Sequence, residues 1–487
     1  MITLSSILSS VGWKFAERVG LQIGKFLLTL ILARLLSPQD YGVVALVLVF
    51  TSIMSTLIQA GFNIALIQKK DATADDFTSV CIFSLFAAFF LYTLLYLSAP
   101  FIANFYHIPS LTQYMRVLGI MLFPGAFNSV QVAFVTKHLQ FKMLTLANFI
   151  ALAISFIAGI ILAYLHFGAW ALIAQQLLMQ MGICIVLMLR MTWSPFRGHF
   201  NLERLRTLFS FGVNILCSNL LITVFLNLRT ILVGKFYTPS ELGVFNRGNH
   251  FPQAIMESVQ STIQSVLLPI YTTEQDDVEL LVLMLRKTIR IAHFILCPLL
   301  MGLLCVAEPL VLITLTDKWV SCIPFVQILA FSYLLHPFQL ITAQAMNAKG
   351  RPDILLRIEI IRKTGEIGLL LLALPVSVKM VAWSAVGAGI IGILATLYPN
   401  FKILKYSLAN QMWDIFPTFG LCILMSICVY FVSYVPISVY LLLPLQILIG
   451  GSIYIGLAYL FKMQAFLDLL KIGKFIYGKY RNKGLAL

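Results

Sequence analysis

The chain has 487 residues, of which 60% are hydrophobic and 11% are charged, and its mean hydropathy is +0.93. Soluble globular proteins have about 25% charged and about 45–50% apolar residues, so the composition excludes a water-soluble protein. The formal charge of +15 comes from 34 Lys and Arg against 19 Asp and Glu. In a polytopic membrane protein this excess is typical of basic cytoplasmic loops, and it does not indicate a nucleic-acid partner.

Long apolar runs separated by short polar breaks predict an all-α integral membrane protein with about fourteen transmembrane helices of ~20 residues each. No break is long enough to hold a separate extramembrane domain. The expected spans are 11–33, 41–64, 79–101, 112–133, 143–165, 168–189, 207–234, 244–268, 288–315, 321–347, 353–375, 380–401, 415–435 and 437–461.

Basic residues are distributed unequally between alternate breaks. The even-numbered breaks contain clusters such as Lys69 with Lys70, and Lys402 with Lys405, whereas the odd-numbered breaks contain isolated cations or none. The positive-inside rule therefore predicts that both termini are cytoplasmic. After the last span, residues 462–487 combine basic and apolar side chains, which predicts a tail that lies on anionic lipid head groups.

An internal repeat relates the two halves of the chain. Residues 27–76 align without a gap with residues 228–277, and the alignment pairs Pro38 with Pro239 and Gly42 with Gly243. The predicted organisation is an N-lobe of six helices at 1–200, a C-lobe of six helices at 201–402, helices 13 and 14 at 403–461, and a basic cytoplasmic tail at 462–487. An even number of spans separates the matched segments, so the lobes are related by a pseudo-two-fold axis along the membrane normal.

Polar and charged residues recur at helical spacing inside several expected spans. A charge at the bilayer centre costs ~2.5–3.5 kcal/mol on insertion scales, so each one requires a partner or a hydrated cavity. The alternative is that these residues are snorkelling anchors and hydrogen bonds between helices. The candidates for substrate contact in a central cavity are Arg18, Lys25, Gln59, Asn63, Asn227, Arg229, Gln253, Glu257, Gln260, Arg362 and Lys363.

Cations outnumber acids among these candidates, which favours an anionic solute such as a phosphate or pyrophosphate. Several prolines, among them Pro124, Pro298, Pro324 and Pro337, lie inside expected spans, where proline kinks or interrupts a helix. The sequence contains no HExxH motif, no Walker A motif and no paired-cysteine spacing, so no metal and no cofactor are expected.

Three segments resemble a known family. They are Ala33–Gly42, Gly234–Gly243 and Ala348–Pro352, together with the Phe245-Asn246-Arg247 start of the eighth span. They resemble bacterial polysaccharide transporters of the multidrug/oligosaccharidyl-lipid/polysaccharide flippase superfamily, and the colanic acid and teichuronic acid exporter group is the most similar. The fourteen-helix pattern and the repeat extend the resemblance to the whole chain.

The resemblance implies a transporter, not an enzyme. It implies a flippase that moves undecaprenyl-pyrophosphate-linked oligosaccharide repeat units across the bacterial inner membrane by alternating access, for exopolysaccharide, capsule, O-antigen or teichuronic-type polymers. The implied partners are the lipid-linked glycan, membrane lipids, and a complex for polymerisation and chain-length control. Family members use cavity cations for the anionic head group, which by position implies Arg18 and Arg229. Near the ends of their spans, Arg34, Lys235 and Arg247 are candidates for gate or loop contacts.

Two alternatives stay open at the level of sequence. An ion-coupled exporter of drugs or small solutes from the same superfamily would require acidic residues, for which Glu17, Glu359 and Glu366 are candidates. The second alternative is a membrane-embedded polymerase or ligase that acts on the same lipid carrier. Enzymes of that type generally place their catalytic residues on a large outward loop, and the outward breaks here are short.

Overall fold

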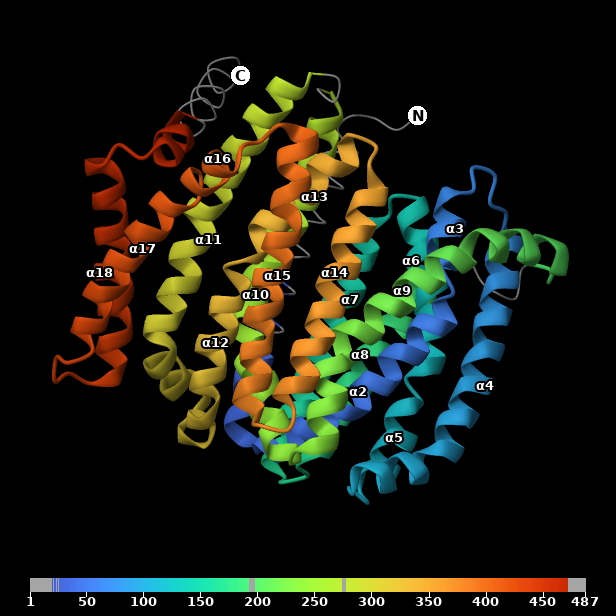
Figure 1. The fold of residues 1–487 in the computed structure, drawn as a ribbon. Coiled ribbons are helices and arrows are strands. Elements are labelled where there is room, and N and C mark those ends of the chain that lie inside the picture. The colour runs from blue at the N-terminus through green and yellow to red at the C-terminus, as the bar shows by residue number, and fades with distance from the viewer. Residues whose placement is uncertain are drawn as a thin grey trace, which may run out of the picture. The chain divides into compact units, whose positions relative to one another are not determined.

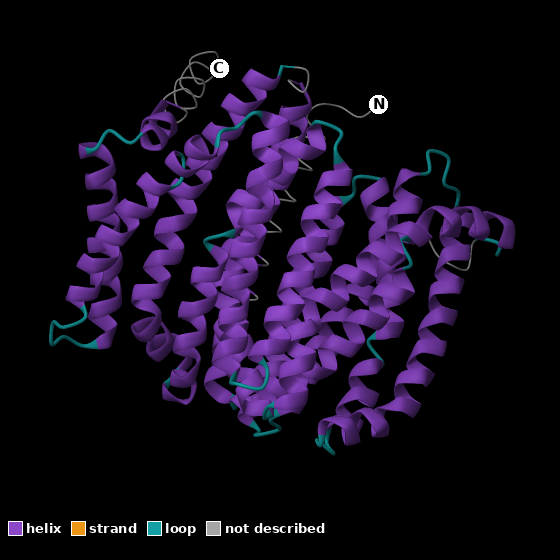
Figure 2. Cartoon of the chain, in the orientation of Figure 1, coloured by secondary structure: helices purple, strands orange, loops and turns teal. Residues whose placement is uncertain are grey.

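The computed structural model describes residues 20, 22, 24, 26–191, 198–273 and 277–471 (Figure 1). Throughout these residues the regular structure is helical and there is no β-strand; short loops join one helix to the next (Figure 2). The prediction of an all-α fold is therefore confirmed. The basic tail was expected at 462–487, and only its first part, up to Lys471, falls within the described residues.

The helices follow the expected spans closely. The first expected span is described only in part, with a short apolar helix at Phe26–Leu35. The remaining elements are α2 (Pro38–Gln59), α3 (Phe62–Gln68), α4 (Ala74–Tyr106), α5 (Leu111–Gly119), α6 (Leu122–Lys137), α7 (Phe141–Tyr164), α8 (Ala169–Arg190), α9 (Leu202–Phe236), α10 (Pro239–Thr273), α11 (Val278–Leu315), η1 (Asp317–Cys322), α12 (Ile323–Tyr333), α13 (His336–Ala348), α14 (Pro352–Ala373), α15 (Val378–Leu404), α16 (Leu408–Trp413), α17 (Phe416–Val432) and α18 (Val439–Leu460).

Eleven helical segments of the described chain are long and apolar enough to cross a membrane. The helices α10 and α14 are not among them, because polar and charged side chains interrupt their apolar character. These two helices coincide with the eighth and eleventh expected spans, which contain most of the candidate residues of the second half. The count of fourteen spans stays a prediction.

Three expected spans are each divided into shorter helices, which corrects the prediction of continuous helices there. Residues 41–64 form α2 and α3, separated by Ala60 and Gly61 with φ of 44° and 71°. Residues 112–133 form α5 and α6, and 321–347 form η1, α12 and α13. Pro124 and Pro337 lie in the first turns of α6 and α13, where a missing backbone N–H costs no helical hydrogen bond. By contrast, α11 continues through Pro298.

By their internal contacts the residues group into two compact units, Met1–Gly243 and Val244–Leu487. The division differs from the repeat-based boundary at residue 200, because α9 packs against α2, α3 and α4 of the first unit. The core of the first unit includes Phe62, Phe77 and Val80, and that of the second includes Tyr271, Leu285 and Phe338. The assignment of two six-helix lobes stays a prediction.

The outward faces of the helices are apolar. Phe86 and Phe101 on α4 are 68% and 77% exposed, and Leu226 on α9 is 76% exposed. In water such side chains would be costly to leave uncovered, at about 25 cal/mol for each Å² of apolar surface. In a bilayer the same surface contacts lipid tails, as expected for membrane-spanning helices.

The internal repeat contains a Pro-x-acid-x-Gly turn, at residues 38–42 and again at residues 239–243. Both copies of this turn have the same helix cap. Ser37 and Asp40 form a capping box at the start of α2, in which the Ser37 hydroxyl donates to Asp40 Oδ2 at 2.6 Å. Thr238 and Glu241 form the same arrangement at the start of α10, with the Thr238 hydroxyl donating to Glu241 Oε2 at 2.8 Å. Each box satisfies N–H groups that have no partner inside the helix.

The glycine in each copy of the turn allows the starts of α2 and α10 to approach closely. A Cβ atom on Gly42 would overlap the carbonyl of Pro239, and a Cβ atom on Gly243 would overlap the carbonyl of Pro38. The contact is reciprocal, because the proline of one copy meets the glycine of the other. The shared Pro-x-acid-x-Gly pattern therefore encodes a cap and a helix contact together.

Candidate functional site

The structure describes most, but not all, of the predicted site residues. Glu17, Arg18 and Lys25 lie outside the described residues. The other candidates divide between the two units, which are considered separately. In the first unit they lie on the Phe26–Leu35 helix, α2, α3 and α9, and in the second unit on α10 and α14.

In the first unit, polar side chains connect α2 with α9. The hydroxyls of Thr56 and Thr223 lie 3.2 Å apart, and Asn227 donates from Nδ2 to the Ser52 hydroxyl at 3.4 Å. A cavity of ≈ 290 Å³ lies beside this contact. Its polar lining residues are Thr56, Gln59, Asn63, Asn219 and Thr223. Two of the predicted candidates, Gln59 on α2 and Asn63 on α3, therefore lie in the wall of a cavity.

A second cavity of the first unit, of ≈ 390 Å³, shares Gln59 and Asn63 with the first cavity. Its remaining polar lining residues come from α2, α6, α7 and α8, and they are Ser55, Asn128, Ser129, Asn148 and Gln180. The Ser129 hydroxyl donates to Asn63 Oδ1 at 2.7 Å, and Asn128 donates from Nδ2 to Gln180 Oε1 at 3.0 Å. The sequence analysis missed these five residues. Isolated amides and hydroxyls inside otherwise apolar spans were the signal that could have identified them.

The basic candidates of the first unit lie near the ends of α9 and of the Phe26–Leu35 helix. Arg229 is half-buried on α9, in the last part of that helix, which ends at Phe236. Lys235, in the last turn of α9, donates to the carbonyl of Phe105 at 2.6 Å, and its Nζ lies 3.9 Å from the centroid of the Phe105 ring. Arg34 is exposed. Lys235 therefore connects the end of α9 to the end of α4.

In the second unit, α10 carries a ladder of hydrogen bonds along one face. Asn249 donates from Nδ2 to Gln253 Oε1 at 3.0 Å, and Gln253 donates from Nε2 to Glu257 Oε1 at 2.6 Å. These residues are four positions apart, so their side chains lie on one face of the helix. Two of the predicted candidates, Gln253 and Glu257, are thus part of a connected row of polar groups that ends in a carboxylate.

The second unit also contains a cavity of ≈ 320 Å³, bounded by α10, α13, α14 and α15. Gln260, Glu359 and Arg362 line it, together with His336 and Gln339. Glu359 accepts a hydrogen bond from Arg362 Nη2, and Arg362 Nη1 lies 3.5 Å from Gln339 Oε1. Three candidates that the sequence placed on two different spans are therefore brought together here.

The remaining candidates of the second unit lie outside that cavity. Lys363 and Glu366 form an ion pair at 2.9 Å, with side chains 21% and 14% exposed. Arg247 is buried inside α10, and its guanidinium carbon lies 5.5 Å from the centroid of the Trp319 ring. Groups of three or more His, Cys, Asp or Glu side chains that could hold a metal ion are absent from the residues that the structure describes.

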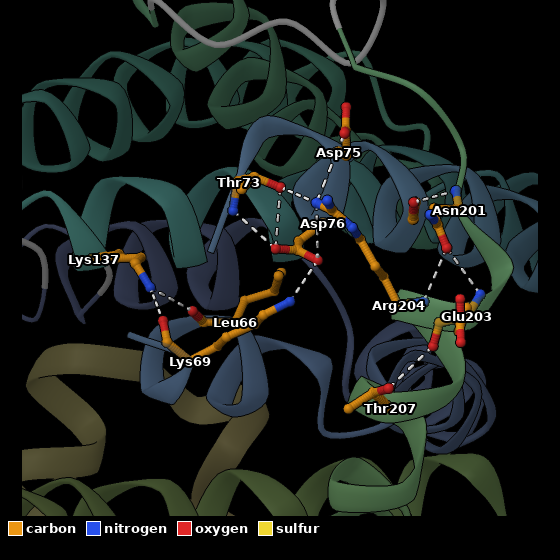
Figure 3. A network of polar contacts seen from close by, with 11 residues as sticks. Leu66, Lys69, Thr73, Asp75, Asp76, Lys137, Asn201, Glu203, Arg204 and Thr207 are labelled. Carbon is orange, nitrogen blue, oxygen red and sulfur yellow. Dashed lines mark hydrogen bonds and ion pairs between the residues drawn. The ribbon is translucent and has the colours of Figure 1, made fainter. Parts of the chain in front are cut away.

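A polar network joins two loops at one end of the first unit (Figure 3). Asp76 is fully buried and lies 2.8 Å from Lys69 Nζ and 4.0 Å from Arg204 Nη1. Asp75 accepts from the His199 N–H at 2.9 Å and lies 3.7 Å from Arg204. The loop before α4 is thereby connected to the loop before α9.

The second unit has a comparable network around Asp414, which is 4% exposed. Asp414 accepts from Arg286 Nε at 2.7 Å and from the Tyr406 hydroxyl at 2.6 Å. Burial and the hydrogen bond to Asp414 raise the pKa of Tyr406 above its ordinary value. The positive-inside rule predicts that both networks lie at the cytoplasmic ends of their helices.

The family comparison matches residues 31–324, more than half of the chain, to the family described as polysaccharide biosynthesis protein. The chain belongs to this family. Together with its helices, this identifies the chain as a multi-pass membrane protein of the polysaccharide biosynthesis class.

Three named relatives share about a quarter or less of their aligned residues with this chain. The chain is 26% identical over 303 residues to the teichuronic acid biosynthesis protein TuaB of Bacillus subtilis, covering 61% of this chain and 62% of TuaB. It is 23% identical over 331 residues to the succinoglycan biosynthesis transport protein ExoT of Rhizobium meliloti, covering 68% and 67%. It is 22% identical over 414 residues to the lipopolysaccharide biosynthesis protein WzxC of Escherichia coli, covering 83% and 82%. The match thus spans less than two thirds of the length of TuaB.

Two solved structures have a similar fold. The lipid II flippase MurJ, in an inward closed conformation, superposes with a TM-score of 0.74 at 14% identity, covering 95% of this chain and 100% of MurJ. An inward-facing multidrug resistance MATE family transporter of the MOP superfamily has a TM-score of 0.63 at 17% identity, covering 80% and 96%. At these identities the likeness establishes the fold alone, an all-α multi-pass membrane fold.

Proposed function

We propose that this protein is a flippase that moves undecaprenyl-pyrophosphate-linked oligosaccharide repeat units from the cytoplasmic to the periplasmic leaflet of the bacterial inner membrane by alternating access. The polymer supplied is an exopolysaccharide, capsule, O-antigen or teichuronic-type glycan. The proposal is carried by one combined observation. The chain belongs to the polysaccharide biosynthesis protein family, and it has uncharged polar cavities between its apolar helices. The relatives named for teichuronic acid, succinoglycan and lipopolysaccharide support the same class of cargo.

The physical problem for such a protein is the polar head group. Moving a pyrophosphate and several sugars through ~30 Å of hydrocarbon without protein contacts is prohibitively costly. Amide and hydroxyl side chains on α2, α3 and α9 offer donors and acceptors along the path, and Arg229 offers a cation for the pyrophosphate. Arg18 has the same proposed role. The prenyl chain stays in lipid, because its transfer between leaflets requires no polar contact.

The acidic candidates bear on how transport is driven. Glu359 and Glu366 each form an ion pair with a cation one turn away on α14. A carboxylate that gives up its cation can bind a proton or a metal cation instead, so these residues, together with Glu17, are the proposed positions for ion coupling. A polymerase and chain-length complex is the proposed partner on the outer side, since it consumes the translocated unit.

Deletion of the gene tests the function directly. We expect the deletion strain to accumulate undecaprenyl-linked repeat units on the cytoplasmic side and to export no polymer, and we expect a plasmid copy to restore export. Thin-layer or mass-spectrometric analysis of extracted lipids provides the measurement. A strain that exports normal polymer and accumulates no lipid-linked sugar would contradict the proposal. Accumulation of lipid-linked but unpolymerised repeat units on the outer side would instead indicate a polymerase.

A further inference from the structure

The two larger cavities, one in each unit, are lined by corresponding helices. In the first unit this is the ≈ 390 Å³ cavity. Its lining residues on α6 have the same spacing as those on α13 in the cavity of the second unit, so that Leu122, Gly125 and Asn128 correspond to His336, Gln339 and Thr342. On the repeat-matched helices, Ser55 and Gln59 of α2 correspond to Met256 and Gln260 of α10. Leu144 and Asn148 of α7 similarly correspond to Leu355 and Glu359 of α14.

Despite this correspondence, the two cavities differ in charge. The cavity of the second unit is lined by Glu359 and Arg362, which form an ion pair, and by His336. In the first unit the described lining residues include no acidic, basic or histidine side chain. Asn148 stands at the position that corresponds to Glu359, and Leu122 stands at the position that corresponds to His336. The ≈ 390 Å³ cavity of the first unit is therefore polar but uncharged.

An uncharged cavity lined by amides and hydroxyls suits a neutral polyol. Asparagine and glutamine side chains each offer donors and an acceptor, and a sugar hydroxyl likewise both donates and accepts. A pyrophosphate would lose its hydration here without gaining a cation, which is unfavourable in a membrane interior. The volume of ≈ 390 Å³ lies within the ~300–1,000 Å³ of small-molecule sites. The apolar part of the wall, including Ile58, Leu144 and Val132, can contact the C–H faces of a sugar ring.

Asn128 supplies an independent indication that the cavity holds a ligand. Its side chain is only 7% exposed, and its Nδ2 donates to the Gln180 carbonyl at 2.9 Å and to Gln180 Oε1 at 3.0 Å. Its Oδ1, by contrast, is buried and accepts no hydrogen bond from the described residues. A buried acceptor without a donor costs about 1–3 kcal/mol, a cost that binding would relieve if a group that enters the cavity reorients the Asn128 amide and donates to it. A hydroxyl of a bound sugar is such a group.

We infer that the ≈ 390 Å³ cavity of the first unit is the glycan subsite of the transporter. It binds a neutral sugar of the repeat unit through Asn128, Ser129, Asn148 and Gln180. The inference rests on the proposed function and deepens it. It separates recognition of the sugar from recognition of the pyrophosphate, because the sugar binds among amides and the pyrophosphate binds to cations elsewhere.

Gly125 allows the subsite to be blocked without disturbing the fold. It lines the cavity, and a Cβ atom built there meets no other atom within 4 Å, so Gly125→Leu extends into open space. Gly420 on α17 is a matched control, since it is another helical glycine whose added Cβ meets nothing within 4 Å, and it does not line the cavity. Asn128→Ala provides a second variant, which removes the unpartnered acceptor without filling the cavity.

The experiment measures binding to the full-length protein in lipid nanodiscs with two probes. One probe is the lipid-linked oligosaccharide extracted from the deletion strain, and the other is undecaprenyl pyrophosphate without sugars. For Gly125→Leu and Asn128→Ala we expect affinity for the oligosaccharide probe to fall roughly tenfold or more, as loss of one or two hydrogen bonds to a sugar implies. Affinity for undecaprenyl pyrophosphate is expected to match wild type, and Gly420→Leu is expected to bind both probes normally.

Each other outcome is decisive. If Gly125→Leu and Asn128→Ala bind the oligosaccharide as tightly as wild type does, the assignment of the cavity as the glycan subsite is wrong, while the proposed function stands. If these variants lower the affinity for both probes equally, the cavity recognises the carrier, and the assignment of the cavity to the sugar is wrong. Wild-type protein that binds neither probe would overturn the proposed function itself, and the subsite with it.

Discussion

Arg286 and Asp414 form a two-point ion pair between α11 and the short connection from α16 to α17. The guanidinium Nε lies 2.7 Å from Oδ2, and Nη2 lies 3.1 Å from Oδ1. Arg290, one turn further along α11, lies 3.3 Å from Oδ1 of the same carboxylate. One buried acid thus holds two arginines of α11 against the start of α17.

Loss of the Asp414 charge is expected to destabilise the protein. Asp414→Asn leaves Arg286 and Arg290 facing each other without a counter-charge, and we expect a loss of about 2–3 kcal/mol, at the lower end for a broken buried pair because both arginines are partly exposed. Thermal unfolding followed by fluorescence-detected size-exclusion chromatography measures the change. Asp353→Asn is the matched control, since Asp353 pairs with Arg351 through two 3.0 Å contacts but is half exposed. Equal destabilisation by the two variants would contradict a role for burial.

The two ion pairs of α14 are expected to contribute unequally to stability. Glu366 is 14% exposed and its pair with Lys363 is partly buried, whereas Glu359 is 49% exposed. Glu366→Gln is therefore expected to cost about 1–2 kcal/mol, and Glu359→Gln less than about 1 kcal/mol. Unfolding temperatures of both variants in the same detergent provide the comparison. A larger loss for Glu359→Gln would show that solvent exposure does not set the strength of these pairs.

The close approach of residues 38–42 to residues 239–243 is expected to reject even a methyl group. In Gly243→Ala the added Cβ overlaps the carbonyl of Pro38, and we expect a loss of about 1–3 kcal/mol as the helix start shifts. Gly42→Ala is expected to behave in the same way, because its Cβ meets the carbonyl of Pro239. Gly420→Ala, which meets nothing, serves as the control. If all three variants unfold at the same temperature, the close approach is not important for stability.

Arg229 is expected to be required for polymer export. If it contacts the pyrophosphate, Arg229→Ala should reduce export by about tenfold or more, and Arg229→Lys should retain part of it, because a lysine keeps the charge but not the two-point geometry. Arg18→Ala is expected to resemble Arg229→Ala. Quantified surface polymer at matched protein levels gives the result, with the exposed Arg190→Ala as control. Normal export by both Arg18→Ala and Arg229→Ala would exclude a cationic cavity.

The predicted sidedness can be tested by cysteine labelling of intact cells. In a variant whose exposed Cys217 and Cys428 are replaced by serine, we expect Ser110→Cys to react with an impermeant maleimide from outside. Lys70→Cys is expected to react only after the cells are permeabilised. The reverse pattern would invert the topology and place both termini outside.

Much of the fold could be predicted from hydropathy alone, because lipid requires each span to satisfy its own backbone hydrogen bonds. The expected ranges coincide with helices throughout the described chain. What hydropathy did not show was the division of three spans. Between α2 and α3 the only sequence sign of the break is Gly61, because Ala60 adopts a positive φ although it is neither glycine nor asparagine.

The candidate site was predicted less completely. Gln59, Asn63, Gln260, Glu359 and Arg362 do line cavities, since polar residues at helical spacing fall on one face. Asn128, Asn148 and Gln180 were missed because each stands nearly alone within its own helix. They form a group only when α6, α7 and α8 pack together, and single-helix periodicity contains no information about that packing.

The reciprocal contact at Gly42 and Gly243 limits how far the two matched segments can diverge. Asn148 and Glu359, which lie outside these segments, were free to differ, because each lines its own cavity. The glycines were not, because each receives the proline carbonyl of the other copy, and neither can enlarge without displacing it. A change in one copy of the turn therefore requires a matching change in the other, whereas each cavity can change its lining residues independently.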